Sequence, residues 1–118
     1  MRIPSVPLVS AGRVGSKVVR RLLDTGREVT GFDLRPAGIA HPAYREVLGG
    51  FDDRAAAVDA VSGSEAILHL GAFMSWLPAD GDRLFRANVE GTRVLLEEAV
   101  RVKPHRLVFA SSGEVYPE

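Results

Sequence analysis

Residues 6–33 read VPLVSAGRVGSKVVRRLLDTGREVTGFD, and this stretch decides the fold. The apolar run at 6–9 predicts a first strand, although its proline makes the strand irregular because proline cannot donate to a sheet ladder. Apolar residues then recur at helical spacing over 14–23, and Gly26 follows where a glycine commonly ends a helix. Residues 28–33 predict a second strand with an aspartate at its end. Strand, helix and strand in this order begin a sheet whose parallel strands are connected by helices.

The same alternation continues along the chain. We expect, in order, a loop at 35–42, a strand at 45–48, a helix at 53–61, a strand at 66–70, a loop at 71–81, a helix from 82 to about 102 and a strand at 106–110. Such alternation favours a parallel sheet with helices on both faces, and right-handed crossovers leave the doubly wound strand order 3-2-1-4-5 as the natural one. The sequence therefore predicts one α/β domain over residues 1–118, with a Rossmann-type sheet of about five strands. Three charge pairs one turn apart are expected to support the long helix: Arg86/Glu90, Arg93/Glu97 and Glu97/Arg101.

The composition is that of an ordinary soluble domain. Hydrophobic residues make up 46% of the 118-residue chain, and its 15 basic and 15 acidic side chains cancel, which disfavours nucleic acid and anionic membranes as partners. The longest apolar stretch, residues 67–77, is too short to span a bilayer. The chain has no cysteine, and His41, His69 and His105 show no metal-like spacing. We therefore expect a cytoplasmic protein without a metal site, with His69 as a hydrogen-bonded core residue.

Two features predict a dinucleotide site. Gly12-Arg13-Val14-Gly15 lies between the first strand and the first helix, where glycines let the backbone approach a pyrophosphate and the helix N-terminus offers free N–H groups. Asp33 follows Gly15 by 18 residues, and a carboxylate at this place would hydrogen-bond the adenosine ribose and repel a 2′-phosphate. Each feature alone also suits an ordinary turn. Together they predict that the chain binds NAD in preference to NADP, although Arg35 would favour a phosphate.

Five short motifs follow one another at regular places in the predicted fold. They are the glycine motif at 12–15, Phe32-Asp33-Leu34-Arg35, His69-Leu70-Gly71-Ala72, Asn88-Val89-Glu90-Gly91-Thr92 and Phe109-Ala110-Ser111-Ser112-Gly113-Glu114-Val115-Tyr116. In this order and spacing they resemble the extended short-chain dehydrogenase/reductase family, which includes NAD-dependent sugar epimerases and dehydratases. The resemblance runs from about Ser10 to the C-terminus.

The resemblance implies a set of cofactor-binding residues. They are Gly12, Arg13, Val14, Gly15, Asp33, Leu34, Arg35, Phe51, Asp52, Leu70, Gly71, Ala72, Asn88 and Ser111. Within this set, the glycine motif would bind the pyrophosphate and Asp33 the adenosine ribose. Gly50-Phe51 falls where the family commonly has an aspartate that contacts the adenine, so Asp52 or Asp53 would replace that aspartate. Ser112 would hydrogen-bond the substrate in the catalytic site.

Two departures from the family pattern limit what the resemblance implies. Counting back from Gly15 places Val9 at the first glycine of the T-G-x-x-G-x-x-G fingerprint, where a β-branched side chain obstructs the tight turn. The Tyr-x-x-x-Lys pair that transfers the proton is absent, because neither Tyr44 nor Tyr116 has a lysine four residues on. The expectation is the NAD-binding part of an epimerase- or dehydratase-like enzyme for a sugar acid or nucleotide sugar, truncated before the substrate-binding region and inactive alone.

The alternative is a non-catalytic nucleotide-binding or dimerising domain of the same fold. Leu107-Val108-Phe109-Ala110 in the fifth strand would form an open sheet edge that invites pairing with a second copy, so we expect a homodimer. The loop Phe73-Met74-Ser75-Trp76 would either shape a substrate pocket or form an apolar flap over the top of the sheet, and we favour the flap.

Overall fold

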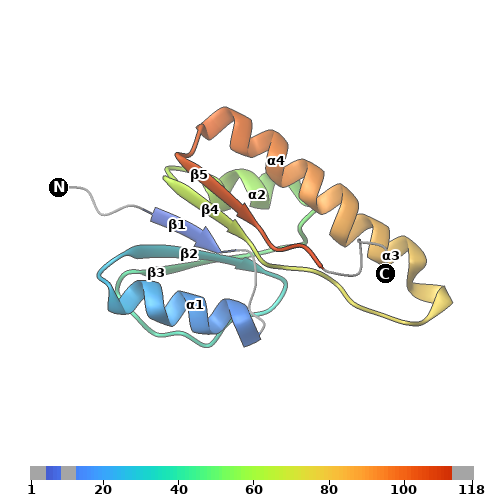
Figure 1. The fold of residues 1–118 in the computed structure, drawn as a ribbon, viewed down its shortest axis with the longest axis horizontal. Coiled ribbons are helices and arrows are strands. Elements are labelled where there is room, and N and C mark those ends of the chain that lie inside the picture. The colour runs from blue at the N-terminus through green and yellow to red at the C-terminus, as the bar shows by residue number, and fades with distance from the viewer. Residues whose placement is uncertain (1–4, 9–12, 113–118) are drawn as a thin grey trace.

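The computed structural model describes residues 5–8 and 13–112 (Figure 1). Its centre is a five-stranded parallel sheet in the order β3-β2-β1-β4-β5. The strands are β1 (Ser5–Leu8), β2 (Glu28–Asp33), β3 (Tyr44–Leu48), β4 (Ala66–His69) and β5 (Arg106–Phe109). β1 pairs with β2 along its whole length and meets β4 through Leu8 and Leu68. The strand order therefore reverses between β1 and β4, and open parallel sheets bind ligands beside such a reversal, at the carboxyl ends of the strands.

Helices cover both faces of this sheet (Figure 1). α1 (Arg13–Asp24) covers one face, and α2 (Arg54–Val61) and α4 (Gly91–Val102) cover the other, whereas α3 (Gly81–Phe85) lies beyond the end of the sheet. On the α1 face, Val19 and Leu23 pack against Val29 of β2. On the opposite face, α2 and α4 enclose a larger core around Phe32 and Ile67. Val29 and Phe32 reach opposite faces because side chains alternate along a strand. The parallel sheet with helices on both faces confirms the predicted α/β Rossmann-type architecture.

Two helix ends follow from single residues. Gly26 has a φ of +81°, and its N–H donates to the Leu23 carbonyl just after α1, as predicted for a glycine at a helix C-terminus. Asp53 is the N-cap of α2, and its carboxylate accepts the Ala56 N–H at 3.2 Å. The cap determines where the β3–α2 loop becomes helical, and this loop carries Phe51 and its neighbours.

The single helix expected from residue 82 to about 102 is interrupted. A 3-10 turn (Pro78–Asp80) leads into α3, and a π-turn (Arg86–Glu90) separates α3 from α4. The Gly91 N–H donates to the Arg86 carbonyl, five residues back instead of four. Such an insertion in a helix frequently marks a functional site. None of the helices within residues 13–112 is long and apolar enough to cross a membrane.

The π-turn also changes the ion pairs along this helical segment. Of the three expected pairs, the described residues form one, Arg93–Glu97 at 4.0 Å. The prediction of Arg86/Glu90 is wrong. Among the described residues, Glu97 and Arg101 form no direct ion pair, but the pKa of the Glu97 carboxyl is lowered by Arg54 and, to a smaller extent, by the charges of Arg93 and Arg101. Glu90 pairs with Arg93, because the extra residue of the π-turn moves it off the face that Arg86 occupies. Glu97 reaches α2 instead, where it lies 2.5 Å from Arg54.

Candidate functional site

A pocket of about 430 Å³ opens at the carboxyl ends of β2 and β4. Its walls are the end of β2, the β3–α2 loop, the loop after β4, and the segment formed by α3 and the π-turn. The lining residues are Asp33, Leu34, Arg35, Gly50, Phe51, Asp52, Gly71, Ala72, Phe73, Arg83, Arg86 and Ala87. The fold thus gathers into one cavity seven residues that the sequence predicted to hold a cofactor, namely Asp33, Leu34, Arg35, Phe51, Asp52, Gly71 and Ala72.

Asp33 is the last residue of β2 and is half-buried in the pocket wall. Its Oδ1 accepts the N–H of Leu34 at 2.6 Å, and its carbonyl accepts the N–H of Gly49 at 3.0 Å. These bonds hold the carboxylate at the end of the strand before any ligand arrives. A carboxylate preset in this way can accept hydrogen bonds from hydroxyl groups, and it repels an anion in the same place.

The β3–α2 loop forms a second wall. The half-buried Phe51 ring meets the rings of Phe32 and His69 edge-on, at centroid distances of 5.8 and 5.9 Å. The loop passes so close to α4 that a Cβ built on Gly91 would lie 2.5 Å from the Phe51 Cβ. Glycine at position 91 therefore allows the close approach that places Asp52 in the pocket.

Asn88, in the π-turn, holds the loop after β4. Its Oδ1 accepts the Phe73 N–H and its Nδ2 donates to the Phe73 carbonyl, both at 2.8 Å. The side-chain amide thus supplies the hydrogen bonds that the backbone of this loop does not find in a sheet. Asn88 does not itself line the pocket, and it shapes the pocket wall through Phe73.

Within the apolar loop at 73–76, Phe73 lies in a different environment from Met74 and Trp76. Phe73 lines the pocket, and the Arg83 guanidinium carbon lies 4.0 Å from its ring centroid, a cation–π contact. Met74 and Trp76 are 79% and 94% exposed, so the favoured prediction of a flap over the sheet is wrong. The Ser75 hydroxyl donates to Asp80 at 2.5 Å, which turns this part of the loop toward α3 and away from the sheet. The alternative, a loop that shapes a pocket, holds for Phe73.

The predicted phosphate loop is only partly within the described residues. Gly12 lies outside them, as does Val9, the departure from the family fingerprint. Arg13 and Val14 are exposed in the first turn of α1, and Gly15 is buried there. None of the described residues of this loop lines the 430 Å³ pocket.

Three further predicted residues also lie outside the pocket lining. Leu70 is half-buried and packs with the apolar cluster on the α1 face. Ser111 and Ser112 are exposed and follow β5. The N–H of Ala110 donates to the His69 carbonyl at 3.0 Å, so the chain leaves β5 alongside the end of β4. Both serines therefore follow β5 at the end of the sheet where the pocket lies.

Apart from Phe73, four lining residues were not among the predicted site residues: Gly50, Arg83, Arg86 and Ala87. The spacing of the two arginines places them on one helix face, but only the tertiary structure shows that this face turns to the pocket. With Arg35 they bring three guanidinium groups to a cavity that also holds two carboxylates. Within the described part of the chain, neither Arg83 nor Arg86 forms an ion pair, while Arg83 makes the cation–π contact with Phe73.

His69 ends β4 beneath this site and is 3% exposed. Its Nε2 lies 2.9 Å from the Thr92 hydroxyl oxygen, which confirms the prediction of a hydrogen-bonded core histidine. Burial lowers the pKa of the imidazole below its usual value, because the charged form loses its hydration.

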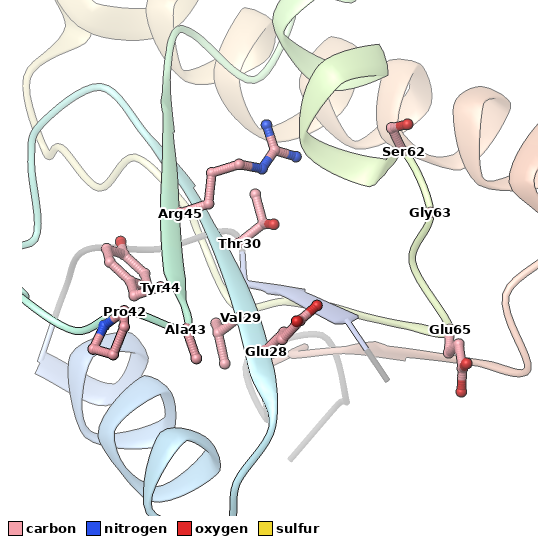
Figure 2. Close-up of a pocket in the computed structure, with 10 residues that line it drawn as sticks. All are labelled: Glu28, Val29, Thr30, Pro42, Ala43, Tyr44, Arg45, Ser62, Gly63 and Glu65. Atoms are coloured by element: carbon pink, nitrogen blue, oxygen red, sulfur yellow. The ribbon is translucent and has the colours of Figure 1, made fainter. Parts of the chain in front are cut away.

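A second cavity, of about 320 Å³, lies at the opposite end of the sheet (Figure 2). Its side chains do not converge, since Arg45 points toward α2, where it binds Asp59 at 2.8 Å, while Tyr44 points to the α1 side. It contains none of the predicted site residues. The described residues also hold no cluster of three side chains suited to bind a metal ion.

Comparisons with known proteins give this geometry a family context. The model of the NAD-dependent epimerase/dehydratase family matches residues 10–118. A short-chain dehydrogenase/reductase superfamily protein from Agrobacterium tumefaciens, solved with bound NAD, is 55% identical, with a TM-score of 0.88 over 96% of this chain and 34% of its own. MoeE5, solved with UDP-glucose and NAD, is 30% identical, with a TM-score of 0.83 over 97% of this chain and 38% of its own. Sterol demethylase protein B of Methylococcus capsulatus is 37% identical over 106 residues, or 87% of this chain and 32% of its own. The chain thus spans about a third of the length of these relatives.

Proposed function

Because the chain belongs to the NAD-dependent epimerase/dehydratase family, we propose that it forms the NAD-binding part of an enzyme that oxidises or isomerises a sugar acid or a nucleotide sugar. The observation that carries the proposal is the pocket that joins Asp33, Phe51 and Asp52 to Gly71 and Ala72. Its place at the carboxyl ends of parallel strands is where such sheets bind dinucleotides. The relatives solved with NAD support this cofactor, and the UDP-glucose held by MoeE5 supports a sugar substrate.

The adenosine half of NAD fits the chemistry of the pocket walls. Asp33 accepts hydrogen bonds from the ribose hydroxyls, and Asp52 and the Phe51 ring lie beside the adenine. Gly71 and Ala72 carry little or no side chain, so the cofactor can pass close to the end of β4. The pyrophosphate lies at the start of α1, where the motif at 12–15 offers backbone N–H groups.

The chain contributes cofactor binding, and the complete reaction belongs to the whole protein. Hydride passes between a substrate carbon and the nicotinamide in the proposed reaction class. Ser112, at the same end of the sheet as the pocket, hydrogen-bonds the substrate. The 118 residues contain no Tyr-x-x-x-Lys pair, so the chain by itself binds NAD without turnover.

Thermal unfolding with NAD and NADP tests the proposal. At a hundred times its dissociation constant, a ligand adds roughly 2.7 kcal/mol to the free energy of unfolding, a shift of several degrees for a domain of this size. NAD should raise Tm more than NADP does, because the Asp33 carboxylate repels a 2′-phosphate. Asp33→Asn should weaken NAD binding about tenfold or more, since a bond to a charged acceptor contributes about 1.5–3 kcal/mol.

Asp24→Asn is the matched control, because Asp24 is exposed at the end of α1 and does not line the pocket. This variant should keep the wild-type response to NAD. No shift of wild-type Tm at millimolar NAD contradicts the proposal. A larger shift with NADP would assign the pocket to a phosphate held by Arg35, Arg83 and Arg86.

A non-catalytic dimerising domain is the second candidate function. β5 ends the described sheet, and Val108 and Phe109 in it are 42% and 53% exposed. An edge strand with exposed apolar side chains favours pairing with a second copy. Sedimentation at micromolar concentration should show a dimer that Val108→Lys dissociates. A monomer that Val108→Lys leaves unchanged would remove this candidate.

A further inference from the structure

The environment of His69 is unusual for a core histidine. Its Nδ1 is buried and has no hydrogen-bond partner among the described residues. The ring lies between Phe51 in the pocket wall and Phe109 at the end of β5, at centroid distances of 5.9 and 5.4 Å. An unsatisfied buried polar atom costs about 1–3 kcal/mol of stability, so an apolar side chain at this position would make the fold more stable. A histidine here is therefore explained best by a role for its other nitrogen, Nε2.

The bonds of Thr92 show which nitrogen carries the proton. The Thr92 hydroxyl oxygen lies 2.7 Å from the Asn88 carbonyl oxygen, and in that pair only the hydroxyl can donate. A hydroxyl has one hydrogen, so the 2.9 Å contact with His69 Nε2 requires Nε2 to be the donor. His69 is therefore the neutral tautomer protonated at Nε2, and a second proton on Nδ1 would find no acceptor.

This hydrogen bond is the first of a series that ends in the pocket wall. Thr92 donates to the carbonyl of Asn88, and the Asn88 side chain binds the N–H and the carbonyl of Phe73. Threonine in a helix has two accessible rotamers, and only one of them turns the hydroxyl to the carbonyl four residues back. The N–H at His69 Nε2 favours that rotamer, because only there does the Thr92 oxygen present a lone pair to the imidazole.

We propose that His69 is a positioning residue, which through Thr92 and Asn88 holds the backbone of Phe73 in the geometry that receives the cofactor. The inference rests on the proposed function for the identity of the ligand and on the hydrogen bonds above for everything else. The imidazole touches no ligand in this role. It acts by keeping one wall of the pocket in a single conformation.

Amide hydrogen exchange of the full chain tests the series of bonds. Thr92→Val removes the hydroxyl at nearly constant volume, and Thr92→Ser restores it. The protection of the Phe73 amide, measured relative to Ile67 in the middle of β4, should fall roughly two- to tenfold in Thr92→Val and return in Thr92→Ser. General destabilisation would instead lower both amides together. Thr25→Val, which removes a similar hydroxyl bond to the Leu22 carbonyl on α1, should leave the ratio unchanged.

Two further measurements keep the inference separate from the proposed function. The ¹⁵N spectrum of the wild-type imidazole should show Nε2 protonated and Nδ1 unprotonated, and this needs no variant. With NAD, Thr92→Val should weaken binding by about the factor seen in exchange. An unchanged ratio of Phe73 to Ile67 protection, or a proton on Nδ1, overturns the inference. Failure of the wild type to bind NAD overturns the proposed function. The positioning role of His69 is still decided by the exchange ratio and the tautomer.

Discussion

Replacing Gly91 with alanine should destabilise the protein, although alanine is the better helix former. A Cβ at position 91 would lie 2.5 Å from the Phe51 Cβ and 3.2 Å from the Phe51 carbonyl carbon, where carbon atoms normally stay about 3.5–4.0 Å apart. Cβ is the first side-chain atom, so no rotamer of Phe51 relieves the clash, and the β3–α2 loop or α4 must move by about 1 Å. Overpacking of this kind costs about 1–3 kcal/mol, and the gain in helix propensity returns about 1 kcal/mol. We expect a net loss of about 1 kcal/mol, with Tm lower by roughly 4 °C or more.

Urea and thermal unfolding of Gly91→Ala measure this loss. Gly81→Ala is the matched control, because Gly81 lies in the same helical segment with φ of −53° and has no atom within 4 Å of a built Cβ. That variant should be more stable than the wild type by about 0.5–1 kcal/mol. The affinity for NAD should fall in Gly91→Ala only, since the displaced loop carries Phe51 and Asp52. If Gly91→Ala proves as stable as Gly81→Ala, the close approach of the loop to α4 is refuted.

Two other predictions follow from buried and exposed charges. The pKa of His69 is lowered in the folded state from its ordinary value of 6.5, so the unfolded chain binds the proton more readily. The free energy of unfolding should therefore fall as pH is lowered from about 7 toward 5, by at most about 1.4 kcal/mol per pH unit. His69→Gln should flatten this slope, and an unchanged slope in that variant would contradict the prediction. Arg54 binds the buried Glu98 at 2.8 Å, whereas Arg45 binds the exposed Asp59. Arg54→Met should lower Tm more than Arg45→Met does, because it leaves the buried Glu98 carboxylate with only the more distant Arg101, at 3.9 Å. Equal losses would show that Arg101 or water compensates for the missing guanidinium.

Much of the fold was predicted from the sequence because its signals are local. The helical spacing over 14–23, the glycine at 26 and the apolar strands each lie within one short segment. Asp33 was assigned to the site in the same way, from its place at the end of a strand. The alternation of these segments then leaves few sheet topologies, and the strands follow the expected order.

Only the tertiary structure decided how the walls of the pocket are held. Asn88 reaches Phe73 across 15 residues, and His69 reaches Thr92 across 23, so no local pattern contains either bond. The helical segment that contains the π-turn approaches the β3–α2 loop closely at Gly91, and this loop lies about 40 residues earlier in the chain. Helical periodicity predicts a regular helix there, whereas packing against Phe51 and hydrogen bonds to Phe73 select the interrupted one. Local propensities differ by about 1 kcal/mol or less per residue, and such long-range contacts together outweigh them.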